Sequence, residues 1–114
     1  MKDERLYLVD ILESIKNIES FISTGKTAFL DSLEKQLAIT RSLEIIGEAS
    51  KKVSDRLKEN YPDVAWSKAA RTRDVLIHDY GKVDPIEIWE ISIKDLPILK
   101  GQIEAILKEL GDPR

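Results

Sequence analysis

Cysteine is absent from this chain, which excludes disulfide bonds, thiolate metal sites and cysteine nucleophiles. Histidine and methionine each occur once, so a transition-metal site is not expected, and the sequence implies no cofactor. Only five glycines and four prolines are present, which leaves little room for turns and favours a few long helices. No apolar run approaches the length of a membrane span, and the N-terminus lacks a signal core. We therefore expect a cytoplasmic protein with no membrane segment.

The remaining composition is that of a folded protein. Of the 114 residues, 42% are hydrophobic and 34% are charged, which predicts one globular domain over residues 1–114. The net charge of −3 argues against a protein that coats nucleic acid. Residues 66–82 nevertheless carry four basic and two acidic side chains. Such a local basic patch fits a small phosphate-binding site better than a long electrostatic track.

Apolar residues recur at three- and four-residue spacing through most of the chain, which is typical of amphipathic helices. The pattern predicts helices over about 4–22, about 31–60 and about 66–77, with a connector at 26–30 that could form one turn. Asp84 followed by Pro85 predicts the start of a fourth helix. Pro97 should kink or break that helix near Asp95, which could cap a final one. No strand pattern is convincing, so we predict an all-α, antiparallel bundle of four to five helices.

The most reactive segment is residues 71–80, which contains the only histidine of the chain. His78 is the side chain best suited to exchange protons near neutral pH. Arg71, Asp74 and His78 have the spacing that places side chains on one face of a helix. Asp74 could therefore hold one imidazole nitrogen and leave the other free as a base. Arg73 and Tyr80 complete a group that could bind a phosphate and move a proton.

Arg73 lies about 140° around a helix from His78, because the two are five residues apart. The two side chains of one chain cannot easily meet unless the helix ends between them. A two-fold dimer built on this helix would bring two copies of each residue to one cleft. The alternative is an ordinary solvated helix end, in which the histidine complements the helix dipole and Arg71 pairs with Asp74.

Two further groups of residues have both a functional and a structural interpretation. Arg41, Glu44 and Glu48 share one face of the second predicted helix and could order a site, but we favour a surface charge network. Trp66 and Trp89 could stack on bases, but they fall within apolar stripes. We therefore favour the hydrophobic core for both tryptophans.

Over nearly its whole length, the sequence resembles the minimal HEPN domains. The resemblance is to the HepT-type toxins, which are encoded beside an MntA-type minimal (MNT) nucleotidyltransferase antitoxin. The central match is an arginine followed after four residues by histidine, any residue and tyrosine, here Arg73, His78 and Tyr80. Four other segments match in the same order, namely residues 5–12, residues 41–49, Pro62 with Trp66, and Val83-Asp84 with Trp89 and residues 95–97.

This resemblance implies a helical homodimer with the motif at its interface, acting as a metal-independent endoribonuclease. In that family scheme His78 takes the proton of a ribose 2′-OH, and Arg73 stabilises charge on the phosphate. The product would be a 2′,3′-cyclic phosphate, and DNA would be inert because it lacks the 2′-OH. The resemblance also implies neutralisation by the MNT-type nucleotidyltransferase, which would attach AMP to Tyr80.

The sequence departs from the family pattern at Asp74, where the family usually has asparagine. An aspartate could orient His78, but it would also repel phosphate and pair with Arg73 or Arg71. A second interpretation is therefore a non-catalytic helical dimer that binds the nucleotidyltransferase or serves as its substrate. A third is a purely structural dimer, in which neither His78 nor Tyr80 has a role.

Overall fold

The computed structural model describes residues 3–76 and 84–114, with side chains at 3–72 and 84–114. All regular structure in these ranges is helical, which confirms the predicted all-α class. The elements are α1 (Arg5–Ile22), α2 (Lys26–Leu30), α3 (Leu33–Lys52), α4 (Asp55–Asn60), α5 (Trp66–Leu76), α6 (Pro85–Glu90), the π-helical turn η1 (Ile91–Asp95) and α7 (Leu96–Leu110).

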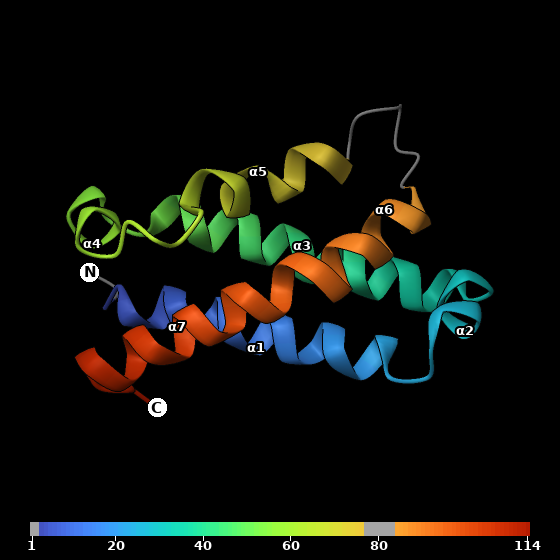
Figure 1. Ribbon diagram of the computed structural model, residues 1–114, viewed down its shortest axis with the longest axis horizontal. Helices are drawn as coiled ribbons and strands as arrows, with labels where there is room; N and C mark the ends of the chain where they lie inside the picture. The colour runs from blue at the N-terminus through green and yellow to red at the C-terminus, as the bar shows by residue number, and fades with distance from the viewer. Residues whose placement is uncertain (1–2, 77–83) are drawn as a thin grey trace.

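The long helices run in alternating directions (Figure 1). Helix α3 packs against both α1 and α5, and α7 packs against α1. The N- and C-terminal ends lie at the same end of the bundle, where the Arg5 side chain donates a hydrogen bond of 3.0 Å to the carbonyl of Gly111. The helices pack into an antiparallel arrangement, but the described residues form seven α-helices rather than the four to five that the sequence predicts.

The core is built from the apolar stripes of these helices, because only their inward faces can leave water. The completely buried residues include Leu8, Ile39 and Ile103 from three different helices. Phe29 of α2 is also fully buried, and its ring lies 5.6 Å from that of Trp89. Trp66 is only 8% exposed, so the core interpretation of both tryptophans is confirmed. No helix in the described ranges is long and apolar enough to cross a bilayer.

The predicted single helix over 31–60 is wrong in its continuity, because the structure divides it into α3 and α4. Helix α3 ends at Lys52, and Val53 and Ser54 adopt extended backbone before α4 begins. The Ser54 hydroxyl caps α4 by accepting a hydrogen bond of 3.1 Å from the Leu57 amide. The Glu4 carboxylate accepts hydrogen bonds from the amide and the hydroxyl of Ser54, at 2.9 and 3.1 Å. These contacts satisfy the polar groups that the interruption of the helix exposes.

The predicted kink or break near Asp95 takes the form of an irregular helical turn rather than a break. The chain passes from α6 to α7 through the π-helical turn η1 without leaving helical backbone. The π turn closes with hydrogen bonds between residues five apart, and Pro97 falls in the first turn of α7 directly after it. The Asp95 side chain caps nothing. It instead forms a 3.1 Å ion pair with Lys68 of α5.

Candidate functional site

Helix α5 carries the first part of the predicted motif, and the chain before it fixes where the helix begins. The Trp66 indole donates a hydrogen bond of 3.0 Å to the Tyr61 carbonyl. Trp66, Ala69 and Thr72 recur every three residues and are buried. Because α5 packs against α3, this buried stripe holds the helix on the bundle.

Helix α6 lies on the other side of the motif. The Asp84 carboxylate accepts a hydrogen bond of 2.9 Å from the Ile86 amide, and Pro85 occupies the first turn. This confirms the predicted helix start at Asp84 and Pro85. Helix α6 also packs against α3. The two helices that flank residues 77–83 are therefore both held by the same helix.

The predicted site residues fall in three groups. Arg71 is exposed on α5. Arg73 and Asp74 lie in the same helix, toward its end at Leu76. His78 and Tyr80 lie outside the described residues, so a contact between Asp74 and His78 stays a prediction.

A charged hollow lies between α4 and the beginning of α5. Its lining includes three basic side chains, Lys58, Lys68 and Arg71, and two acidic ones, Asp55 and Glu59. We call it the α4–α5 hollow. The sequence did not predict this hollow, because one continuous helix to residue 60 would not place the residues of α4 beside α5. The available signal was the serine-aspartate pair at 54–55, which is a common helix start.

An apolar groove lies between α5 on one side and η1 with the first turns of α7 on the other. Ala69 of α5 and Ala65, which directly precedes this helix, line one wall. Branched side chains line the other wall, namely Ile91, Leu96, Ile98 and Leu99. Ile98 is 65% exposed at this groove. The ion pair between Lys68 and Asp95 joins the two walls across the groove.

The charged face of α3 is a set of separate surface pairs. Arg41 forms an ion pair of 3.4 Å with Glu44, and Glu48 forms one of 3.5 Å with Lys52. The predicted surface charge interpretation is therefore confirmed, although Glu48 pairs with Lys52 rather than with Arg41. Exposed pairs of this kind contribute less than about 1 kcal/mol each, and they need no functional explanation.

Comparison with known proteins gives this helical domain a class. The family model described as "Ribonuclease HepT-like" matches residues 11–106. A relative from Thermococcus cleftensis, named "Probable ribonuclease HepT", is 44% identical over 105 residues, which are 90% of this chain and 94% of the relative. No solved structure matches the chain significantly.

Two further relatives agree with this match. One from Methanocaldococcus jannaschii, named as a "Putative RNase", is 41% identical and covers 96% of this chain and 91% of its own length. Another with the same designation, from Caldanaerobacter subterraneus, is 37% identical and covers 96% of this chain and 98% of its own length. These relatives define the class as ribonucleases. The chain belongs to the HepT-like ribonuclease family.

Proposed function

We propose that this protein is a dimeric, metal-independent endoribonuclease of the toxin type, and that Arg73 and His78 are its catalytic residues. The observation that carries the proposal is the family match over residues 11–106, which contains the complete motif. The helices on both sides of the motif supply support, because α5 and α6 are each packed on α3. They provide a rigid base from which the reacting groups can project.

The proposed reaction needs one base and one group that stabilises negative charge. His78 takes the proton of a ribose 2′-OH, and the 2′ oxygen attacks the adjacent phosphorus. The bond from phosphorus to the 5′ oxygen breaks, that oxygen takes a proton from water, and the proton held by His78 returns to the solvent. Arg73 stabilises the extra charge on the phosphoryl oxygens during the attack. The products are a 2′,3′-cyclic phosphate and a 5′-hydroxyl end, and DNA cannot react because it lacks the attacking group.

Asp74 and Arg71 are proposed as supporting residues. Asp74 would orient the imidazole of His78 by accepting a hydrogen bond from one ring nitrogen. Arg71 lies three residues before Asp74 and is exposed, so it can offset part of the carboxylate charge near the substrate. The aspartate also repels phosphate, so we propose that it lowers the rate relative to the asparagine usual in the family.

The active unit is proposed to be a homodimer, since Arg73 and His78 of one chain lie about 140° apart on a continued helix. The apolar groove between α5 and α7 supports this arrangement. Ala69, which lines the groove, lies four residues before Arg73 in α5. A second copy seated in the groove would therefore approach the motif.

Neutralisation is proposed to occur at Tyr80. An MNT-type nucleotidyltransferase would transfer AMP from ATP to the phenolic oxygen and release pyrophosphate. The attached group adds bulk and negative charge beside Arg73, which excludes an anionic substrate. Replacing the phenol by Tyr80→Phe should abolish AMP transfer by the partner, as measured by the mass of the intact protein.

The test of the nuclease is cleavage of total RNA and transfer RNA in EDTA, followed by analysis of the product ends. We expect cyclic phosphate ends from the wild type and no products from Arg73→Ala or His78→Ala. Mixing these two inactive variants should restore part of the activity if a site takes Arg73 from one subunit and His78 from the other. An inactive wild type that still forms dimers would refute the nuclease.

The second candidate is a non-catalytic dimer that binds the nucleotidyltransferase. The specific observations in its favour are Asp74 in the motif and the net charge of −3, both of which disfavour an RNA substrate. This candidate predicts that His78→Ala leaves growth inhibition unchanged, whereas the nuclease predicts its loss. A purely structural dimer would respond to neither His78→Ala nor Tyr80→Phe.

A further inference from the structure

We propose that the α4–α5 hollow binds the backbone of single-stranded RNA beside the cleaved bond, with Lys58 and Arg71 as the phosphate contacts. This inference rests on the proposed function, because it extends the substrate beyond the reacting nucleotide. It assigns Lys58 as a substrate-positioning residue, which the sequence motif does not contain.

The charges of the hollow leave two cations available for an anionic ligand. Lys68 is already engaged by Asp95 at 3.1 Å. Among the side chains that the structure describes, no carboxylate forms an ion pair with Lys58 or Arg71, although both residues line the same hollow. Lys58 belongs to α4 and Arg71 to α5. An RNA strand in the hollow would therefore be contacted from two different helices.

The position of the hollow along α5 leads toward the motif. Arg71 lies five residues before Leu76, which is about 7.5 Å along the helix axis. Lys68 lies eight residues before Leu76, or about 12 Å. A strand that leaves the reacting phosphate and follows α5 back toward its beginning would therefore pass Arg71 first and then enter the hollow.

The chemistry of the hollow favours the phosphate backbone over the bases. Its one tryptophan, Trp66, is 8% exposed and already bonded through its indole nitrogen, so it offers no stacking surface. Contacts from lysine and arginine to phosphate position a strand without reading its sequence. The expected ligand is single-stranded RNA of any sequence. It is bound by electrostatic attraction, which weakens as the salt concentration increases.

The acidic residues of the hollow oppose this binding. Removing an acidic side chain should therefore have the opposite effect on RNA binding to removing a basic one. Glu59 follows Lys58 directly and lines the same hollow as Asp55. Removing the negative charge of Glu59 should therefore strengthen RNA binding, whereas removing the positive charge of Lys58 should weaken it. A hollow with no role in RNA binding predicts no effect of either substitution on RNA.

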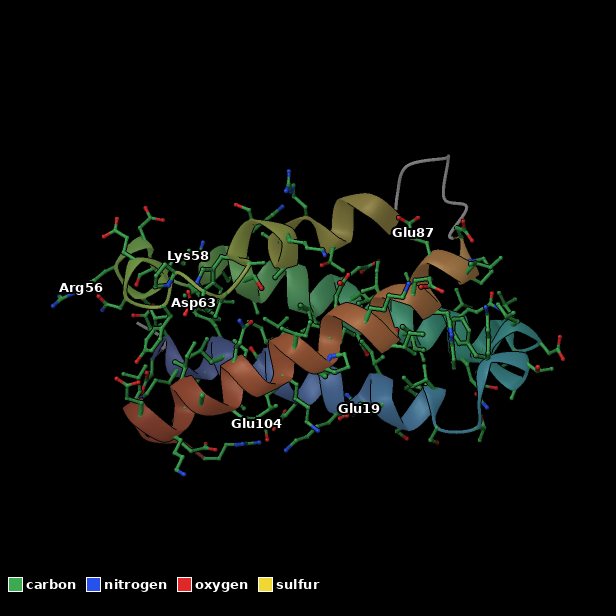
Figure 2. The ribbon with its side chains drawn as sticks, viewed as in Figure 1. Glu19, Arg56, Lys58, Asp63, Glu87 and Glu104 are labelled. Atoms are coloured by element: carbon green, nitrogen blue, oxygen red, sulfur yellow. The ribbon has the colours of Figure 1, made fainter. Side chains whose placement is uncertain are left out.

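Arg56 provides a matched control on the same short helix. In Figure 2 the Arg56 side chain projects outward from the end of the molecule, while Lys58 lies on the side of α4 nearer α5. Arg56 is exposed and does not line the hollow. Arg56→Gln and Lys58→Gln thus remove the same charge from the same helix but from different surfaces.

The experiment measures kcat/KM for a dinucleotide and for a single-stranded RNA of about 16 nucleotides. The ratio of the second value to the first should fall about tenfold in Lys58→Gln, stay at the wild-type value in Arg56→Gln and rise in Glu59→Gln. In Lys58→Gln/Arg71→Gln, the slope of log KM for the longer RNA against log salt should decrease by about 1.4, or about 0.7 for each lost phosphate contact.

An unchanged ratio in Lys58→Gln, with both substrates still cleaved, would overturn only the proposal that the α4–α5 hollow binds RNA. The proposed nuclease activity would stand. An equal fall in Lys58→Gln and Arg56→Gln would also overturn it, because the effect would then be one of net charge. A wild type that cleaves neither substrate would overturn the proposed function and this inference with it.

Discussion

Substituting Ser54→Ala should destabilise the protein by about 2 kcal/mol, because Ser54 fixes the unexpected turn between α3 and α4. The hydroxyl accepts the hydrogen bond from the Leu57 amide that caps α4, and loss of such a cap costs about 1 kcal/mol. The same hydroxyl donates to the Glu4 carboxylate at 3.1 Å. Loss of that charge-assisted bond at a half-buried site adds about another 1 kcal/mol.

The assay is urea denaturation followed by circular dichroism, with thermal unfolding as a second measure. For a chain of this size, 2 kcal/mol corresponds to a decrease in Tm of roughly 8 °C. The control is Ser23→Ala, which removes an exposed hydroxyl bonded only to the Ser20 carbonyl and should cost less than about 0.5 kcal/mol.

A double-mutant cycle with Glu4→Ala separates the two contributions. Ser54 and Glu4 should be coupled by about 1 kcal/mol, because each single substitution removes the bond that they share. If Ser54→Ala costs no more than Ser23→Ala, or if the coupling is zero, the account of the break between α3 and α4 is refuted.

The remaining predictions concern the core, the active site and the C-terminal tail. Phe29→Ala should cost about 3–5 kcal/mol in urea denaturation, since Phe29 is completely buried against Trp89; a cost below about 1 kcal/mol would contradict this packing. Asp74→Asn should raise kcat/KM for RNA a few-fold, and a decrease would show that the carboxylate assists catalysis. Hydrogen bonds from the Arg114 side chain lower the pKa of Asp112 to about 2, so their stabilising effect is complete above the usual pKa of 3.8 and is lost as the pH falls through 2. Carbon NMR titration should find this low midpoint in the wild type and a higher one in Arg114→Ala, which keeps only the hydrogen bond from the backbone amide of residue 114; a wild-type midpoint near 3.8 would contradict the pairing.

Local signals in the sequence were sufficient where one helix decides its own limits. The predicted start of the third helix at Trp66 agrees with α5, and the first helix was predicted to within one residue of Arg5–Ile22. Asp84 and Pro85 mark the start of α6 because a capping carboxylate and a proline in the first turn act within a few residues. Such features need no knowledge of the tertiary structure.

The break after α3 could not be found from periodicity, because Val53 within the break and Leu57 after it are both buried. The apolar stripe therefore continues although the helix does not. The contact that stabilises the break comes from Glu4, which is 50 residues away in the sequence. At Pro97 the sequence could not decide between a kink and a break, and the structure keeps the chain helical there through the π turn η1.

The candidate site likewise has one part that local sequence signals indicate and another part that depends on the fold. The motif residues Arg73, Asp74, His78 and Tyr80 were identified from type and spacing, which depend on the sequence alone. The α4–α5 hollow was not, because Lys58 meets α5 only after the chain turns between α3 and α4. A contact formed by two separate helices requires the fold.

The central claim is tested most directly by incubating the purified wild type and His78→Ala with RNA in EDTA, beside a strand whose mapped cleavage position carries a 2′-deoxyribose. The account predicts cleavage of the RNA by the wild type, with a 2′,3′-cyclic phosphate end. It also predicts no cleavage of the deoxy-substituted position and none by His78→Ala. Equal cleavage by the wild type and His78→Ala, or cleavage at the deoxyribose, would contradict the proposed chemistry.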